Sequence, residues 1–140
     1  STVRDPIDRF KSAYAYIKSG GRSLNDNILM KKLTVDMKFD YFIDYLMEND
    51  IDKDSNLFHF HTQTSYLCNP RNRHLIIVDR VYRLNNLDVL MRDFTENSKQ
   101  KPISSKFLKL NSSVSSEINL TKKQEEKIST VYNIDYVNFF

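Results

Sequence analysis

A helix start at Asp5-Pro6 is the sequence feature that most constrains the fold of this chain. Asp5 suits the N-cap position because its carboxylate can accept hydrogen bonds from the free N–H groups of the first turn. Pro6 follows at the first helical position, where a missing N–H costs nothing. Apolar residues then recur at helical spacing: Ile7, Phe10, Tyr14 and Ile17. The stretch therefore predicts the end of a strand, a tight entry and an amphipathic helix with one apolar face.

Three polar side chains flank this helix start and can bracket one anion. Arg4 precedes the cap, and Ser12 lies seven residues after Asp5, which returns it to almost the same side of a helix. Arg9 lies one turn before Ser12 and can join them. A guanidinium fork together with a hydroxyl group suits a phosphate. An ordinary capped helix with a solvated Arg and Ser explains the same residues, so this stretch alone leaves both interpretations open.

The pattern Arg4-Asp5-Pro6-x-x-Arg9-x-x-Ser12-x-Tyr14 resembles the 3′-phosphate-binding motif of sulfotransferases that use 3′-phosphoadenosine-5′-phosphosulfate (PAPS). In that family the first Arg and the Ser hold the 3′-phosphate of the nucleotide. The resemblance implies that Arg4 and Ser12 anchor this phosphate, with Arg9 supporting them. It also implies PAPS as the donor, 3′,5′-adenosine bisphosphate (PAP) as the product, and no metal cofactor.

A second stretch, residues 57–68, contains two of the three histidines of the chain. His-x-His is a common two-ligand unit for zinc, but a third ligand would have to come from elsewhere, so a metal site is disfavoured. The segment from His59 to Leu67 is also similar to a stretch of carbohydrate sulfotransferases, His-Phe/Trp-x-Pro-Gln-x-x-Phe/Tyr-Leu, except that Thr62 replaces the usual Pro. The two matches occur in the order expected for that family.

The second match implies roles for its polar side chains. Sulfuryl transfer to a hydroxyl group needs a base, and an imidazole can take a proton near neutral pH. His59 or His61 is therefore a candidate catalytic base, and Gln63 a candidate for binding the acceptor. A structural role for the histidine pair remains an equal alternative, as does a base in an upstream segment.

Later segments extend the resemblance. Residues 83–87, Arg-Leu-Asn-Asn-Leu, are similar to the family's Arg-Phe-Glu-Asn-Leu, with Asn85 where Glu is usual, so Asn85 is given no acid or base role. In relatives a loop rich in Asn, Ser and Lys closes over the nucleotide. This implies donor contacts for Lys109, Asn111 and Ser112, with a Ser-rich linker as the alternative.

Glycine is nearly absent, since Gly20 and Gly21 are the only two and suit the end of the first helix. A loop that cradles phosphates needs glycines so that backbone N–H groups can approach the ligand. The family carries its loop for the 5′-phosphosulfate upstream of the Arg-Asp-Pro motif. The resemblance therefore implies that this loop is missing here, either because the chain is the C-terminal part of a longer enzyme or because it is a diverged relative.

Composition bounds the remaining possibilities. The chain has 140 residues, 40% of them hydrophobic and 28% charged, which predicts one globular domain over residues 1–140. A net charge of +3 is compatible with anionic ligands but does not demand nucleic acid, and the aromatic residues follow core spacings. The single Cys68 excludes an internal disulfide, and no apolar run approaches the length of a membrane span.

Periodicity predicts the other elements. Helices are expected over residues 35–49, 86–94 and 121–132, with a short one around 27–32, and Thr121 with Gln124 forms a capping-box pattern. Asp36, Asp40 and Asp44 are expected to form a solvated stripe. The apolar run His74–Asp79 is expected to be a parallel strand buried on both faces.

These observations, with the resemblance, predict an α/β chain. The resemblance implies a P-loop-type three-layer fold with a parallel sheet, helix-rich and incomplete at its N-terminus in this chain. It implies a sulfotransferase that moves a sulfuryl group from PAPS to a carbohydrate hydroxyl. A non-catalytic nucleotide- or anion-binding module derived from that fold and a kinase-like nucleotide enzyme are the alternatives. The lack of disulfides, and a glycosylation sequon at Asn111, favour a bacterial or viral cytoplasmic protein over one of the Golgi lumen.

Overall fold

The computed structural model describes residues 1–21, 23–31, 37–98 and 118–140. Helix α1 (Pro6–Lys18) begins where the sequence predicts, and the Oδ1 atom of Asp5 accepts a hydrogen bond from the Asp8 N–H at 3.1 Å. Strand β1 (Thr2–Val3) precedes it and pairs in parallel with β4 (Tyr82–Arg83), with Val3 opposite Arg83. The predicted strand end, cap and helix are confirmed.

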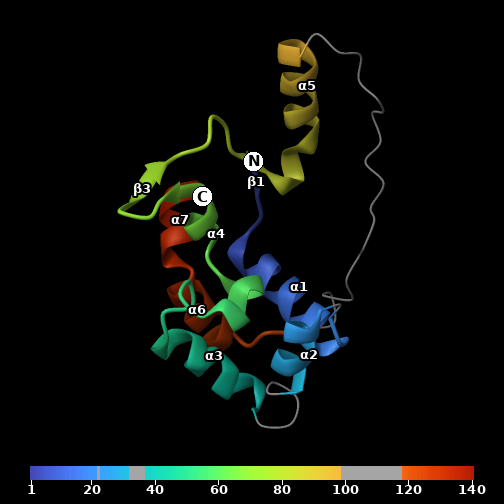
Figure 1. Ribbon diagram of the computed structural model, residues 1–140, viewed down its shortest axis with the longest axis vertical. Coiled ribbons are helices and arrows are strands. Elements are labelled where there is room, and N and C mark those ends of the chain that lie inside the picture. The colour runs from blue at the N-terminus through green and yellow to red at the C-terminus, as the bar shows by residue number, and fades with distance from the viewer. Residues whose placement is uncertain (22, 32–36, 99–117) are drawn as a thin grey trace.

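Short elements make up the rest of the described chain. In order they are α2 (Leu24–Lys31), α3 (Phe39–Glu48), the 3-10 helix η2 (Ser55–Phe60), α4 (Gln63–Leu67), β2 (Cys68–Asn69), β3 (Asn72–Ile76), η3 (Leu84–Asn86), α5 (Leu87–Ser98), α6 (Lys122–Val131) and α7 (Asn133–Phe139). Figure 1 shows α1, α2, α3 and α6 gathered in one part of the molecule, whereas α5 extends away from it.

The core lies between α1, α3, η2 and α6, and aromatic rings dominate it. Phe10, Phe42 and Phe60 are at most 1% exposed. The Phe60 ring lies 5.7 Å from that of Phe10 and 5.0 Å from that of Phe42, measured between centroids. The hydroxyl of the buried Tyr132 donates to the carbonyl oxygen of Phe60 at 2.8 Å. Phe60 therefore fixes the His59–Gln63 segment to the core.

The helix predictions hold in kind and differ in length. The described part of α3 is shorter than residues 35–49, and its Asp40 and Asp44 are not simply solvated, because Gln124 and Lys127 of α6 bind them. Helix α5 runs four residues past its predicted end, and α6 begins with the predicted capping box. Asp36 lies outside the described residues.

The prediction of a buried parallel strand over residues 74–79 is wrong. Strand β3 spans Asn72–Ile76 and pairs antiparallel with β2, in a hairpin at the surface. Leu75 is 53% exposed and Ile77, just beyond the strand, is 59% exposed. An apolar β-branched run is buried only where a layer covers both faces of its sheet, and within the described residues nothing covers β3 in this way.

The described residues form a helix-rich α/β chain with one parallel and one antiparallel two-stranded sheet, which confirms the mixed class. The three-layer arrangement stays a prediction. In the part of the chain that the structure describes, no helix is long and apolar enough to cross a membrane.

Candidate functional site

Gln63 fixes the backbone of Arg4. Its side-chain Oε1 accepts a hydrogen bond from the Arg4 N–H at 2.8 Å, and its Nε2 donates to the Arg4 carbonyl oxygen at 2.8 Å. The Gln63 residue is only 7% exposed. Because an amide group carries both a donor and an acceptor, this side chain pairs with Arg4 as a neighbouring strand would. The contact joins the two stretches that the sequence singles out.

Arg9 makes a second connection between these stretches. Its Nη1 donates to the carbonyl oxygen of His61 at 2.6 Å. The guanidinium group has five N–H donors, so this bond leaves others for an anion. Ser12 follows one turn after Arg9 on the same side of α1 and is half-buried with a partner of its own.

His59 lies against α1 and α2. Its Nε2 is 2.9 Å from Oδ1 of Asp26, a carboxylate that is 2% exposed. The Tyr16 hydroxyl donates to Oδ2 of Asp26 at 3.1 Å, and the Tyr16 ring centroid lies 5.0 Å from that of His59. Tyr16 is the residue one turn beyond Ser12 on α1, so the imidazole lies beside the helix face that carries Arg9 and Ser12.

The absence of a side chain at Gly21 leaves the space that the Asp26 side chain occupies. Gly21 follows α1 with φ +55°, and a Cβ atom at this position would lie 2.2 Å from the Cβ of Asp26. The sequence predicts the two glycines as a helix end, and both have positive φ there. The close approach to Asp26 is a second reason why Gly21 must lack a side chain.

His61 is held at both ring nitrogens. Its Nε2 lies 2.9 Å from the carbonyl oxygen of Asp54, and its Nδ1 lies 3.2 Å from the Tyr66 hydroxyl, which donates to the carbonyl oxygen of Phe58 at 3.0 Å. Since a carbonyl oxygen only accepts, Nε2 carries a proton. Burial raises the pKa of Tyr66 while the charge of Arg9 opposes that shift. Hydrogen bonds at both nitrogens thus hold the His61 ring in place.

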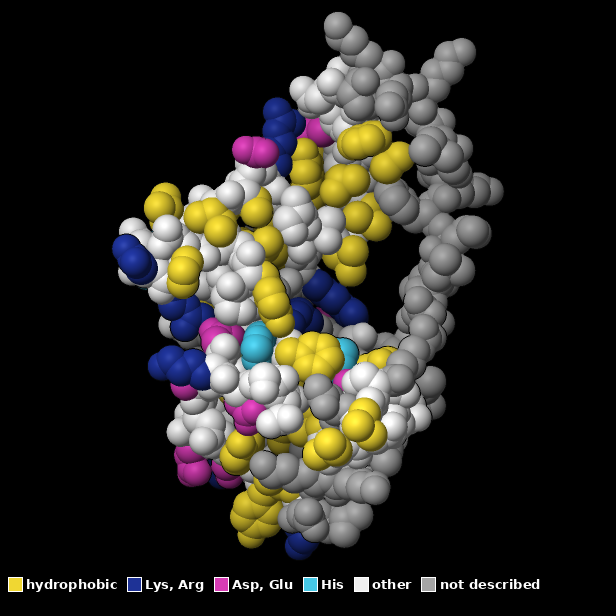
Figure 2. Space-filling view, in the orientation of Figure 1, with side chains coloured by type: hydrophobic (Ala, Val, Ile, Leu, Met, Phe, Trp, Pro, Cys, Tyr) yellow, Lys and Arg dark blue, Asp and Glu magenta, His cyan; other side chains and the backbone are white. Residues whose placement is uncertain are grey.

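His59 and His61 are both half-buried. Figure 2 shows imidazole surfaces on one face of the molecule, with exposed hydrophobic side chains between them and Lys or Arg side chains nearby. Phe58 and Tyr66 are 37% and 54% exposed, and their rings lie 3.9 Å from His59 and 5.9 Å from His61, respectively. This face therefore combines basic, titratable and aromatic groups.

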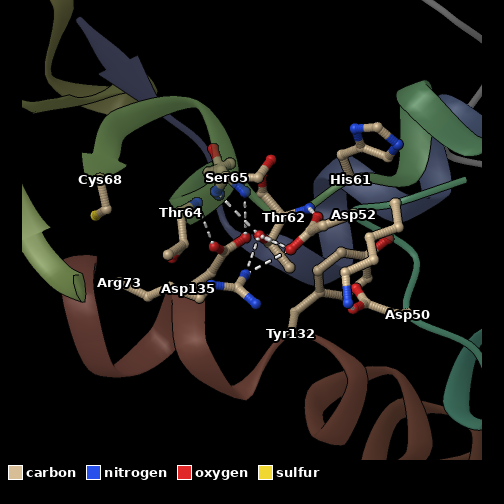
Figure 3. Close-up of polar contacts among 12 residues, drawn as sticks. Asp50, Asp52, His61, Thr62, Thr64, Ser65, Cys68, Arg73, Tyr132 and Asp135 are labelled. Carbon is tan, nitrogen blue, oxygen red and sulfur yellow. Dashed lines mark hydrogen bonds and ion pairs between the residues drawn. The ribbon is translucent and has the colours of Figure 1, made fainter. Parts of the chain in front are cut away.

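Hydrogen bonds between Thr62 and Asp52 hold the residue that directly follows His61. Thr62 is the N-cap of α4, and Asp52 accepts from its N–H at 2.7 Å and from its hydroxyl at 2.8 Å. Arg73 pairs with the same carboxylate at 2.5 Å. Figure 3 shows these side chains converging at the start of α4.

Asp135 of α7 supplies the other support. Its two carboxylate oxygens accept hydrogen bonds from the N–H groups of Gln63 and Thr64, both at 2.8 Å, and the residue is fully buried. Figure 3 shows this side chain pointing from α7 into the first turn of α4. The carboxylate thus satisfies N–H groups that a helix start leaves free.

The structure joins Arg4 to Gln63 and Arg9 to His61, and it places His59 beside α1, the helix that also carries Ser12. Lys109, Asn111 and Ser112 lie outside the described residues. The supporting residues Asp26, Asp52 and Asp135 were not predicted as part of the site. Asp26 left a local signal, the Ser23-x-x-Asp26 pattern of a helix cap, which is present at the start of α2. Among the described residues, no three His, Cys, Asp or Glu side chains gather as a metal site requires.

Comparison with known proteins gives one match. Neither the curated proteins nor the solved structures contain one that matches this chain. A family model described as "Sulfotransferase family" matches residues 1–140. The match covers both stretches that Gln63 and Arg9 join, and it agrees with the resemblance that those stretches carry. The chain belongs to the sulfotransferase family.

Proposed function

We propose that this protein transfers the sulfuryl group of PAPS to a hydroxyl group of a carbohydrate, with the donor's 3′-phosphate held by Arg4, Arg9 and Ser12. The observation that carries the proposal is the pair of hydrogen bonds between the Gln63 side chain and the Arg4 backbone. They join the phosphate-binding motif to the histidine stretch, which a transferase needs in order to bring donor and acceptor together.

The position of Arg4 in the fold supports the same proposal. Arg4 directly follows the carboxyl end of β1, which pairs in parallel with β4. Ligands of open α/β sheets bind outside the carboxyl ends of the parallel strands. The proposal therefore includes a P-loop-type three-layer fold in which β1 and β4 belong to the central sheet.

The chemistry is an in-line displacement at sulfur. A new S–O bond forms to the acceptor oxygen, the S–O bond to the donor's 5′-phosphate breaks, and its electron pair leaves on the phosphate oxygen. The acceptor proton passes to a base, for which the histidine stretch provides the candidates His59 and His61. Arg4 and Arg9 hold the negative charge of the nucleotide while backbone N–H groups and basic side chains stabilise the transferring group.

Calorimetric titration with PAP, 5′-AMP and ADP tests the nucleotide assignment. We expect PAP to bind best, and Arg4→Ala to weaken PAP binding by about 10–100-fold, because a hydrogen bond to a charged group contributes about 1.5–3 kcal/mol. Arg92→Ala on the exposed surface of α5 is the matched control and should retain the preference. Equal binding of the three nucleotides, or an unchanged Arg4→Ala variant, would contradict the assignment.

The acceptor class needs a separate experiment. Transfer of radiolabelled sulfate from PAPS should occur to mono- and oligosaccharides and not to phenols or amines of similar size. Labelling of phenols instead of sugars would contradict a carbohydrate acceptor while leaving sulfuryl transfer intact.

A second candidate is a non-catalytic module that binds the nucleotide. Gly20 and Gly21, the two glycines among these 140 residues, lie in the turn after α1 and form no phosphate-cradling loop there, which is compatible with such a module. Selective PAP binding without transfer to any acceptor would identify this module.

A further inference from the structure

His59 and His61 differ in how many of their ring nitrogens form hydrogen bonds within the protein. Both ring nitrogens of His61 face protein partners, Asp54 and Tyr66. In His59 only Nε2 has a partner, Asp26, since no described residue forms a hydrogen bond with its Nδ1. The His59 side chain is 26% exposed, so solvent or a substrate can reach this ring.

The carboxylate that binds His59 is built into the protein interior. Asp26 is 2% exposed, and it also accepts from the Tyr16 hydroxyl at 3.1 Å and from the Ser23 N–H at 2.9 Å. An ionised carboxylate only accepts hydrogen bonds, so the nitrogen that faces it, Nε2, carries the proton. Nδ1 of the neutral ring is then left with a lone pair.

The neighbours of the ring keep this orientation. Phe58 lies 3.9 Å and Tyr16 lies 5.0 Å from the His59 ring, measured between centroids. Rotation of the ring would break the bond to Asp26 and remove one of the hydrogen bonds that satisfy this buried carboxylate, which is costly. The geometry is that of an imidazole oriented by a carboxylate, an arrangement that prepares the other nitrogen to take a proton.

We infer that Asp26 is a positioning residue that presents Nδ1 of His59 as the base of the sulfuryl transfer. This inference rests on the proposed function and selects His59 over His61. As the acceptor oxygen forms its bond to sulfur, its proton moves to Nδ1, and the positive charge on the ring is stabilised by Asp26. The proton returns to water after PAP and the sulfated product leave.

The first test is the tautomer of His59, read from ¹⁵N chemical shifts and long-range ¹H–¹⁵N couplings of histidine-labelled protein at pH 8. We expect Nε2 protonated and Nδ1 unprotonated in the wild-type protein. A ring protonated at Nδ1 would overturn the inference. This measurement requires neither PAPS nor turnover, so it is independent of the proposed function.

The second test compares the rates and nucleotide affinities of Asp26→Asn and Asp44→Asn. Asp26→Asn should reduce the rate of transfer by at least tenfold, give a mixed His59 tautomer and leave PAP affinity within about twofold. Asp44, whose carboxylate pairs with Lys127 on α6, provides the control, and Asp44→Asn should change none of these three quantities. A folded Asp26→Asn variant that transfers at the wild-type rate would overturn the inference. Wild-type protein that binds PAP but transfers nothing would instead refute the proposed function.

Because Asp26 also caps α2, the amide variant can lose structure. His59→Gln then replaces it, since His59 caps no helix. We expect His59→Gln to lose transfer by about 10²-fold or more with PAP binding retained, and wild-type transfer by this variant would overturn the inference.

Discussion

At the scale of single residues, the amide of Gln63 has the largest consequence for the site. One side chain satisfies both the N–H and the carbonyl oxygen of Arg4, and it is buried. The direction in which Arg4 leaves β1 therefore depends on a residue 59 positions away. Gln63, a candidate for binding the acceptor by resemblance, has both of its polar atoms engaged with Arg4. We assign it to positioning Arg4, for which phosphate binding is proposed.

We predict that Gln63→Glu destabilises the protein by about 1–3 kcal/mol and weakens PAP binding. The carboxylate keeps the acceptor for the Arg4 N–H but loses the donor to its carbonyl oxygen, which leaves a poorly satisfied buried pair. Urea denaturation and calorimetry measure the two effects. Asn133→Asp at the exposed start of α7 adds the same charge and should cost less than about 1 kcal/mol. Equal effects of both substitutions would contradict the role of Gln63.

At the scale of elements, α4 shows how a short helix is held in place. It has 5 residues, far too few to be stable alone. Its first residue, Gln63, follows His61 by two positions, so the placement of α4 also fixes the end of the segment that contains both histidines. Asp52 binds its N-cap residue, and Asp135 binds its first two N–H groups (Figure 3). The local conformation of α4 is therefore imposed by carboxylates from two other parts of the chain.

We predict that Asp135→Asn destabilises the protein by about 2–3 kcal/mol. An amide side chain has one acceptor oxygen, so one N–H of α4 loses its partner and faces an NH₂ group instead. Chemical denaturation measures the change. Asp88→Asn, in the exposed first turn of α5, should stay within about 0.5 kcal/mol of wild type. A similarly small effect at Asp135 would mean that α4 is held elsewhere.

Helix α5 should show a pH-dependent attachment. The Tyr82 hydroxyl at 2.9 Å and Nη1 of Arg80 at 2.7 Å donate to Asp93, joining α5 to β4, and these bonds lower the pKa of the Asp93 carboxyl, with the Tyr82 bond having the larger effect. A lowered folded-state pKa stabilises the folded form above the ordinary carboxyl pKa, and this contribution is lost as pH falls through the lowered value.

We therefore predict that α5 loosens on acidification below the ordinary pKa of an aspartate, at about pH 4, before α6 does. Protection factors of α5 amides in hydrogen exchange, corrected for intrinsic rates, measure this loosening. Asp93→Asn should have a weakly attached α5 at all these pH values. The same acid response in that variant would show that another group is responsible.

At the scale of the whole molecule, local and distant contacts differ in how well the sequence predicts them. The caps at Asp5 and Thr121 and the helix faces are set by neighbours within four residues, so spacing predicts them. The bonds between His59 and Asp26 and between Gln63 and Asp135 span 33 and 72 residues, and no local pattern encodes them. Resemblance could name Arg4, Ser12 and His59 but not the carboxylates beneath them. The exposed β3 was misjudged because an apolar run does not show whether anything covers it.

The reactivity of the single cysteine, Cys68, reports whether α7 stays packed against α4. Cys68 is 3% exposed, and burial, followed by the charge of Asp135, raises the pKa of its thiol while Arg73 opposes this. Asn138 of α7 covers the region, since its Nδ2 donates to the Thr64 hydroxyl at 3.1 Å and to the Arg73 carbonyl oxygen at 2.8 Å.

We predict that native Cys68 reacts with a disulfide reagent at least tenfold more slowly than in urea, because only an accessible thiolate reacts. Asn138→Ala should speed the native reaction by loosening α7, whereas Lys122→Ala on the exposed start of α6 should not. The absorbance of the released thiolate follows the reaction. Labelling of the native protein as fast as in urea would mean that α7 does not protect this region.

The bond between Asp135 and α4 also affects how the protein is made. A ribosome adds Asp135 72 residues after Gln63, which takes roughly 4–14 s at about 5–20 residues per second. During that interval the nascent chain carries its histidine stretch without the carboxylate that fixes it. The histidine stretch can therefore adopt its final conformation only after Asp135 has been made, and a chaperone that binds the nascent chain before then finds the first turn of α4 without this partner.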